Sequence, residues 1–316
     1  MLPKLSVILC THNARQDYLE RTFEGLKCQT LPKEQWEFLL IDNLSDPPLE
    51  QICDLSWHPA ARVVREEELG ILPARVRGFH ETSADLILFL DDDNVISPNY
   101  FEVALQIGIN YPFLGAWGAG RIELEYEASP PIWIKEFEYL FTPLNLKEER
   151  WAKMGLGNPV MPPTMGMCLR RVVADKFLDI VATDPRRKLL GRRGKKQFFN
   201  CEDNDLALCA CDLGLSTGQF PQLAFRHLIP ARRLDLNYLL ALYEGTHCSY
   251  HVLASLRGTP LTQAVSNPSR RLLGKLRRIL FLPKIERKKL ERREKAQSHA
   301  FKIIKGWKGL MTSESF

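Results

Sequence analysis

Acidic residues gather in two short segments, FLDDDN at 89–94 and CEDND at 201–205, and these have the best composition for chemistry. In the first segment, three aspartates directly follow an apolar run. Carboxylates spaced in this way at a strand end hold Mg²⁺ or Mn²⁺, which keep coordination positions for water and phosphates. A solvated turn capping the next helix is the alternative, but three adjacent carboxylates repel one another and a turn does not need all three. The segment therefore predicts a divalent cation beside a diphosphate.

The second segment places Glu202 and Asp203 at the start of a predicted helix. Acids in a first helical turn gain roughly 0.3–1 kcal/mol from the helix dipole, so both residues are also explained as helix starters. The same dipole is expected to lower the pKa of a carboxylate and make it a weak base. A weak base still suffices if a hydroxyl gives up its proton late in the reaction. Composition alone leaves a catalytic and a structural role open.

Three further residues have side chains suited to binding. His227, in FRHLIP, follows a short apolar run and could meet a metal or phosphate, or be a satisfied structural histidine. Arg75, in GILPARVRGF, could reach a phosphate or a base edge, or lie on a helix surface. His12 could stack on a base, or only finish the first strand.

The elements that must position these residues follow from apolar runs of strand length, at 5–10, 38–41, 61–64 and 86–90. Helical periodicity follows the first, third and fourth runs, which predicts an α/β fold with a mostly parallel central sheet flanked by helices. Ligands bind beyond the carboxyl ends of such strands. The polar residues at that edge are Thr11, His12, Asn13, Asp42, Asn43, Asp91, Asp92, Asp93 and Asn94.

The second half of the chain is less regular. We expect a strand near 114–123, a short helix over 132–141, a mobile basic loop over 185–197 and a strand over 223–226 that ends before His227. A helix from Glu202 should stop at Gly214. Another helix is expected over 236–256, with an interruption at Gly245.

Composition and charge narrow the functional class. The eight cysteines are scattered without a CxxC pair, which favours reduced thiols over a zinc site or a disulfide framework. Neither a signal peptide nor an apolar run of about 18 residues is evident, so a cytoplasmic protein is expected.

Residues 270–308, named the basic tail here, hold 15 Lys and Arg against three Glu. The remaining chain is mildly acidic and shows no nucleic-acid motif, so we expect no nucleic-acid partner. The mixture of cations with Leu, Ile and Phe suits the anionic inner face of a membrane, or equally a solvated helix packed on the main domain. The expected domains are a catalytic one over 1–235 and a helical extension over 236–316.

Four segments together, LSVILCTHNA, FLLIDN, GILPARVRGFHETSADLILFLDDDN and CEDNDLALCACDLGL, resemble the family-2 glycosyltransferases in order and spacing over roughly residues 4–235. The resemblance implies the A-type nucleotide-sugar-binding fold. Cys201, where glycine commonly precedes the ED pair, and His12, where tyrosine is common, depart from the family pattern.

The resemblance also assigns roles to individual residues. It implies nucleotide-sugar contacts for Thr11, His12, Asn13, Asp42, Arg75, Asp91 and Asp92. The family's DxD motif falls on Asp91 and Asp93, which implies a Mn²⁺ or Mg²⁺ site that His227 could join. Its ED motif falls on Glu202 and Asp203, with Asp203 as the catalytic base.

The resulting hypothesis is an inverting transfer of a sugar from a nucleotide-diphosphate sugar to the hydroxyl of a glycan or lipid-linked acceptor, in cell-surface polysaccharide or glycolipid synthesis. Two alternatives stay open: a noncatalytic nucleotide-binding protein and a metal-dependent phosphohydrolase. A dinucleotide dehydrogenase is disfavoured because no GxGxxG follows the first strand.

Overall fold

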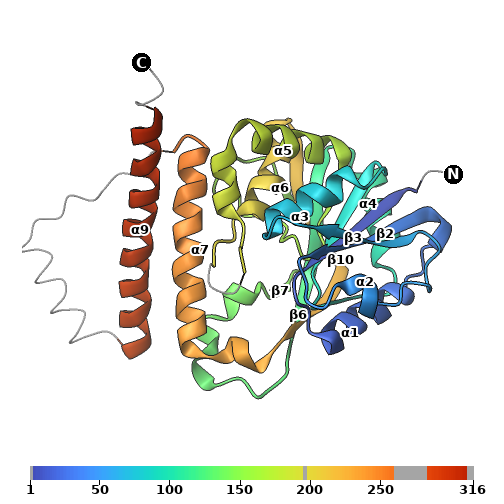
Figure 1. The fold of residues 1–316 in the computed structure, drawn as a ribbon, viewed down its shortest axis with the longest axis horizontal. Coiled ribbons are helices and arrows are strands. Elements are labelled where there is room, and N and C mark those ends of the chain that lie inside the picture. The colour runs from blue at the N-terminus through green and yellow to red at the C-terminus, as the bar shows by residue number, and fades with distance from the viewer. Residues whose placement is uncertain (1–2, 195–197, 260–282, 312–316) are drawn as a thin grey trace, which may run out of the picture.

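The structure, a computed structural model, describes residues 3–194, 198–259 and 283–311. A ten-stranded sheet lies at its centre, with helices on both faces and two long helices side by side at one end (Figure 1). The main strand order is β3-β2-β1-β4-β9-β6-β10-β5. The expected α/β class is therefore confirmed.

The first four strands form the parallel part of the sheet: β1 (Leu5–Thr11), β2 (Trp36–Asn43), β3 (Ala61–Glu66) and β4 (Leu86–Leu90). Every residue of β1 and β2 is buried, as expected of central strands that are covered on both faces. Because these strands run in one direction, their carboxyl ends meet at one edge. Thr11 and Asp42 are paired in register there.

The second part of the sheet is mixed. The long strands β6 (Leu114–Tyr126) and β10 (Ser216–Ile229) are parallel to each other. The short strands run antiparallel to their neighbours: β5 (Asn94–Ile96), β7 (Leu144–Asn145), β8 (Arg150–Ala152) and β9 (Cys168–Arg170). The mostly parallel arrangement thus holds for the long strands, and short antiparallel strands join and extend them.

Alternate side chains of β1 enter two separate cores, as the two-residue period of a strand requires. Leu5, Val7 and Leu9 pack in the core under α1 (Gln16–Lys27) and α4 (Tyr100–Asn110), with the short α2 (Leu49–Ile52) on the same face. Ile8 and Cys10 pack in the core under the opposite helices, α3 (Ile71–His80), α5 (Arg171–Thr183) and α6 (Glu202–Asp212). The sheet is thereby fixed from both sides.

The strand expected over 223–226 is only part of β10, which is 14 residues long. Its register against β6 shifts between Phe220 and Ala224, around Pro221. Proline cannot donate to a sheet ladder and is tolerated at such irregularities, so the strand continues past it. At the other end, His227 pairs with Leu124 of β6 and Asn94 of β5, so it lies within β10, and the prediction that it follows the strand is wrong.

Several connections form 3₁₀ turns: η1 (Lys33–Gln35), η2 (Ile132–Glu136), η3 (Glu138–Phe141), η4 (Pro185–Leu190) and η5 (Ala231–Leu234). The helix expected over 132–141 is thus two short turns. Part of the expected basic loop is η4, which begins where the Asp184 carboxylate accepts a hydrogen bond from the Arg186 amide at 3.2 Å.

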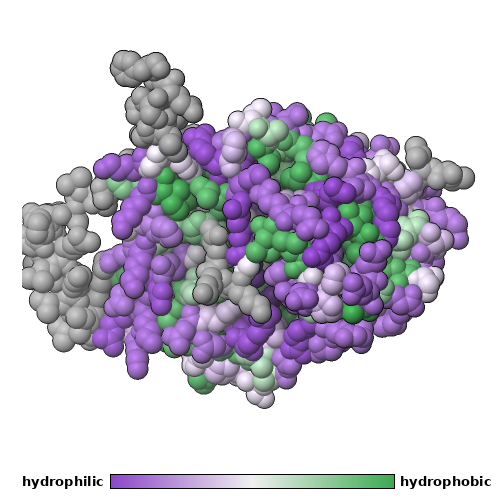
Figure 2. All heavy atoms as spheres, viewed as in Figure 1, coloured by the Kyte–Doolittle hydropathy of each residue, from purple (hydrophilic) through white to green (hydrophobic). Residues whose placement is uncertain are grey.

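Two helices complete the described chain, α7 (Leu236–Leu256) and α9 (Lys284–Met311). Ala296, Ala300 and Trp307 of α9 are buried in one cluster with Val252 and Leu253 of α7. Residues 270–282 of the basic tail lie outside the described residues. The part of the tail that lies in α9 packs on α7, and the surface of α9 that Figure 2 shows is largely hydrophilic. None of the helices in the described ranges is long and apolar enough to cross a membrane.

Candidate functional site

Asp93 is the most strongly held of the three strand-end aspartates. Its Oδ1 accepts a hydrogen bond from the side-chain amide of Asn94 at 3.0 Å. Its Oδ2 lies 3.1 Å from a guanidinium nitrogen of Arg233 and 3.6 Å from Nε2 of His227. With only 8% of its side chain exposed, the carboxylate is surrounded by donors that come from the end of β10 and from η5.

The hydrogen bonds of His227 fix which ring nitrogen carries the proton. Nδ1 lies 3.1 Å from the carbonyl oxygen of Phe141, which can only accept, so Nδ1 donates. Nε2 is then the nitrogen with a free lone pair, and Arg233 donates to it at 3.3 Å. This tautomer, held by a backbone carbonyl, is the one that a metal-ligating histidine adopts.

The three aspartates respond differently to this environment. Burial disfavours the Asp93 anion, but His227 and the Arg233 guanidinium beside it outweigh burial and lower the pKa of Asp93. Burial and the neighbouring Asp93 raise the pKa of Asp92 to about 6, and its hydrogen bond from the Thr11 hydroxyl opposes the rise. Burial and Asp93 also raise the pKa of Asp91. Asp93 is thus ionised, and a further positive charge nearby would favour the ionised forms of Asp91 and Asp92 as well.

The second acidic pair lies at the start of α6 and is anchored by Arg75 of α3. Arg75 donates to Oε1 of Glu202 at 2.6 Å and to the Thr164 hydroxyl at 2.9 Å. Both charged side chains of this ion pair are almost completely buried. Burial raises the pKa of Glu202 to about 7 against the attraction of Arg75, while Asp203 reinforces the rise.

Arg75 also joins the two acidic groups of the site. Its positive charge acts on Asp91 as well as on Glu202 and Asp203. The two segments, 111 residues apart between Asp91 and Glu202 in the sequence, therefore face one guanidinium. Its role as a nucleotide contact stays a prediction, because the observed partners of Arg75 are Glu202 and Thr164.

Asp203 is partly exposed, and its carboxylate accepts a hydrogen bond from the Asn204 amide at 2.7 Å. Burial raises its pKa, with Arg75 and the helix amides acting in the opposite direction. The expectation that the helix dipole would leave Asp203 with a lowered pKa is therefore wrong. A raised pKa makes its carboxylate a stronger base.

The residues after β1 form a turn against the end of β2. His12 donates from Nδ1 to the Asn43 carbonyl at 2.7 Å, and Asn13 adopts a left-handed conformation with φ of 52°. The Asn13 amide donates to the Ser45 hydroxyl at 3.0 Å, which ties the two turns together. The sheet edge thus brings Thr11, His12 and Asn13 beside Asp42, as the strand pattern predicts.

Asp42 is only 1% exposed, and its oxygens are fully engaged. They accept hydrogen bonds from the amides of Ser45 at 2.8 Å and Leu49 at 3.1 Å, and from the Arg65 guanidinium at 2.8 Å. Burial opposes its ionisation, but these donors outweigh burial and lower its pKa. Asp42 therefore holds the segment before α2 in place, and a nucleoside contact through it stays a prediction.

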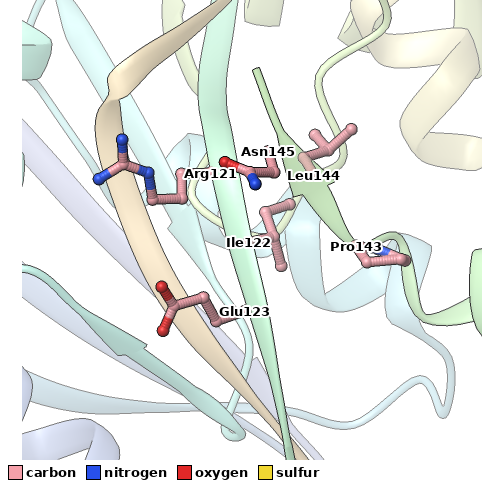
Figure 3. A pocket seen from close by; sticks show the side chains of 6 residues that line it. All are labelled: Arg121, Ile122, Glu123, Pro143, Leu144 and Asn145. Atoms are coloured by element: carbon pink, nitrogen blue, oxygen red, sulfur yellow. The ribbon is translucent and has the colours of Figure 1, made fainter. Parts of the chain in front are cut away.

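A surface hollow of about 440 Å³ opens beside β6 and β7. It is lined by Arg121, Ile122, Glu123, Pro143, Leu144 and Asn145 (Figure 3). It contains none of the residues predicted from the sequence. Within the described ranges, no group of three or more His, Cys, Asp or Glu side chains is arranged to hold a metal ion, so the predicted ligands Asp91, Asp93 and His227 do not form such a group.

Sequence reasoning missed three residues that complete the site. Arg233 contacts both Asp93 and His227, and Thr164 supports Arg75. Arg192 is half-buried, and its charge acts on both Asp93 and Glu202. The adjacent arginines at 232 and 233 are visible in the sequence as candidates for binding an acid. Only the fold shows that Arg233, and not Arg232, turns toward Asp93.

The sequence model described as Glycosyl transferase family 2 matches residues 6–176, more than half of the chain. Two characterised relatives are similar over shorter stretches. AglE of Haloferax volcanii, a glycosyltransferase, is 27% identical over 40% of this chain and 41% of its own. Polypeptide N-acetylgalactosaminyltransferase 16 of mouse is 29% identical over 33% of this chain and 19% of its own. The chain thus matches less than half the length of each.

Solved structures resemble nearly the whole chain. The crystal structure of S. aureus TarS 1-349 superposes with a TM-score of 0.52 and 15% identity, covering 94% of this chain and 80% of TarS 1-349. The complex of the same protein with UDP-GlcNAc gives 0.52 and 14% identity over 95% and 81%. This likeness confirms the A-type fold.

Proposed function

The chain belongs to glycosyl transferase family 2, and from that premise we propose that it is an inverting transferase that moves a sugar from a nucleotide-diphosphate sugar to an acceptor hydroxyl. The observation that carries this proposal is the position of Arg75. Its guanidinium binds Glu202 and acts electrostatically on Asp91 and Asp203, so a base and a diphosphate-binding edge share one site.

In the proposed reaction, Asp203 removes the proton of the acceptor hydroxyl. The oxygen of the acceptor attacks the anomeric carbon as the bond to the nucleotide diphosphate breaks, so that configuration inverts. The raised pKa of Asp203 supports this role, since proton transfer is most efficient when the pKa of the base approaches the working pH. Glu202, held by Arg75, fixes the start of α6 and therefore the position of Asp203.

Mn²⁺ or Mg²⁺ is the proposed cofactor, and the donor set of this chain fits it. Asp93 supplies an ionised carboxylate, His227 presents Nε2 in the metal-binding tautomer, and Asp91 offers a second carboxylate. Such cations retain positions for water and phosphate oxygens, so a few protein ligands are enough. When bound, the cation would neutralise charge on the departing diphosphate.

The proposed nucleotide edge consists of Thr11, His12 and Asn13 with the neighbouring Asp42 and Arg75. The acceptor is proposed to be a glycan or lipid-linked sugar of cell-surface polysaccharide or glycolipid synthesis. Peripheral binding of the basic tail to an anionic membrane is part of this proposal. The exposed lysines of α9, at 284, 295, 302 and 305, support it.

A test of the proposal starts with a panel of nucleotide sugars, UDP-GlcNAc included because TarS has been crystallised with it. Thermal stabilisation of the purified protein, measured with and without Mn²⁺, identifies the donor. Donor hydrolysis or transfer is then measured for the wild type and for Asp93→Ala, which should abolish it. Absence of stabilisation and turnover with every donor would refute the proposed activity.

A further inference from the structure

Arg233 occupies the space in which a cation would meet Asp93 and His227. The same guanidinium nitrogen lies 3.1 Å from Asp93 Oδ2 and 3.3 Å from His227 Nε2. Oδ1 of Asp93 already accepts a hydrogen bond from Asn94 and Nδ1 of His227 donates to Phe141, so Oδ2 and Nε2 are the atoms that these neighbours leave to a metal. A guanidinium and a divalent cation therefore compete for the same pair of ligand atoms.

The surroundings make this contact persistent. The charged carboxylate is buried, and an unpaired buried anion is strongly destabilising, so it retains a counter-charge whenever no metal is present. Arg233 is held near it by its backbone, because η5 follows β10 directly and the Arg233 amide donates to the Pro230 carbonyl at 2.8 Å. Arg232, next to it, is exposed instead.

We infer that Arg233 is a built-in counter-cation, which holds Asp93 and His227 in the donor-free protein and must leave them before a divalent cation binds. This inference rests on the proposed function. A nucleotide diphosphate gives the guanidinium an alternative anionic partner, since guanidinium binds phosphate oxygens well. Metal and diphosphate then bind cooperatively, and metal alone binds weakly.

The test measures Mn²⁺ affinity by calorimetric titration without nucleotide, in the wild type, Arg233→Gln and Arg232→Gln. Each substitution removes one positive charge from the same segment, but only Arg233 contacts the ligand atoms. We expect Arg233→Gln to bind Mn²⁺ at least tenfold more tightly than the wild type and Arg232→Gln to stay within about twofold. Added UDP should raise the Mn²⁺ affinity of the wild type more than that of Arg233→Gln.

Two further variants make the result decisive. Asp93→Asn should lose the tight site, which shows that the titrated Mn²⁺ is bound there. Arg233→Lys keeps the positive charge but not the planar guanidinium, so it should give an intermediate Mn²⁺ affinity. It replaces Arg233→Gln in the comparison if that variant does not fold. Equal Mn²⁺ affinity in the wild type and Arg233→Gln overturns the counter-cation role while leaving the transferase proposal intact. Absence of Mn²⁺ binding in every variant, with or without UDP, overturns the metal part of the proposed function as well.

Discussion

Asp203 and Asp205 are two residues apart on the first turn of α6, yet their carboxylates differ in burial and in the number of their partners. Asp205 is completely buried, and its two oxygens form ion pairs with Arg187 of η4 and with Arg257 at the end of α7. Asp203 is partly exposed, and its one hydrogen bond within the described residues comes from the neighbouring Asn204 amide. The side of α6 that carries Asp205 is covered by arginines and is called its closed side here, whereas the side that carries Asp203 is partly exposed.

The difference shows that acidity alone does not separate a catalytic residue from a structural one. Asp205 connects α6 to η4 and α7, and its charge is neutralised by the arginines of these two elements. Asp203 keeps its charge available to a ligand, while Glu202 beside it ties the helix to α3 through Arg75. The same four-residue acidic segment thus supplies a base, its positioning residue and a structural clamp.

The largest expected effect is on turnover. Asp203→Asn removes a base without changing shape or leaving a buried cation unpaired, so transfer should fall by roughly 10³-fold or more. The donor should still bind and the free energy of unfolding should change by less than about 1 kcal/mol. Single-turnover assays and chemical denaturation of the same preparation measure both. Turnover within tenfold of the wild type would remove Asp203 from the role of base.

Asp205→Asn should have the opposite pattern. Arg187 and Arg257 would lose their shared counter-charge in a buried environment, which costs about 3–5 kcal/mol. Urea denaturation should show this loss. The control is Asp212→Asn, which breaks the more exposed ion pair with Arg257 and should cost about 1 kcal/mol or less. Equal losses for the two variants would contradict the contrast between a clamped and an open acid.

Glu202, the third acid of this helical turn, should make the free energy of unfolding depend on pH. Its pKa is raised from 4.5 to about 7 in the folded protein, mainly by burial. Between these values the unfolded chain has released the proton and the folded one retains it, so the free energy of unfolding falls as pH rises. Across that window the loss should reach about 3 kcal/mol relative to Glu202→Gln, which does not titrate. A wild-type-minus-variant difference that stays flat from pH 4.5 to 7 would contradict the burial effect.

The sequence predicted the part of the site that a parallel sheet positions. Apolar runs identified β1 to β4, and parallel strands necessarily bring the residues after them, such as Thr11, Asp42 and Asp91, to one edge. Gly214 after α6 was also recognisable, and its φ of +79° confirms a turn that favours glycine. Local patterns sufficed because the alternation of strands and helices sets the strands parallel, and a glycine marks the end of a helix.

The remainder depended on tertiary contacts that no local pattern contains. Arg75 has helical spacing whether it faces solvent or Glu202, and Arg232 and Arg233 are adjacent arginines that only the direction of η5 distinguishes. His227 pairs with Asn94 of β5 and Leu124 of β6, so these contacts extend β10 beyond the short apolar run that the sequence shows. In each case the partner lies far away in the sequence, and long-range packing decides between equal local alternatives.

The smallest expected effect on stability is that of replacing Gly245 of α7, a helix that packs on the closed side of α6. The sequence suggested that it interrupts α7, but the helix is continuous there. A Cβ at this position would lie 2.4 Å from the backbone oxygen of Phe198, so glycine is required for α7 to approach the chain leading into α6. Gly245→Ala should therefore cost about 2 kcal/mol by overpacking, despite the better helix propensity of alanine.

Gly306→Ala on α9 is the matched control for this effect. A Cβ at Gly306 meets nothing within 4 Å, so helix propensity alone acts and the variant should gain up to about 1 kcal/mol. Thermal denaturation of both variants therefore gives shifts of opposite sign. A gain from Gly245→Ala would mean that the chain at Phe198 yields easily. The closed side of α6 would then be fixed by the Asp205 ion pairs and not by the packing of α7.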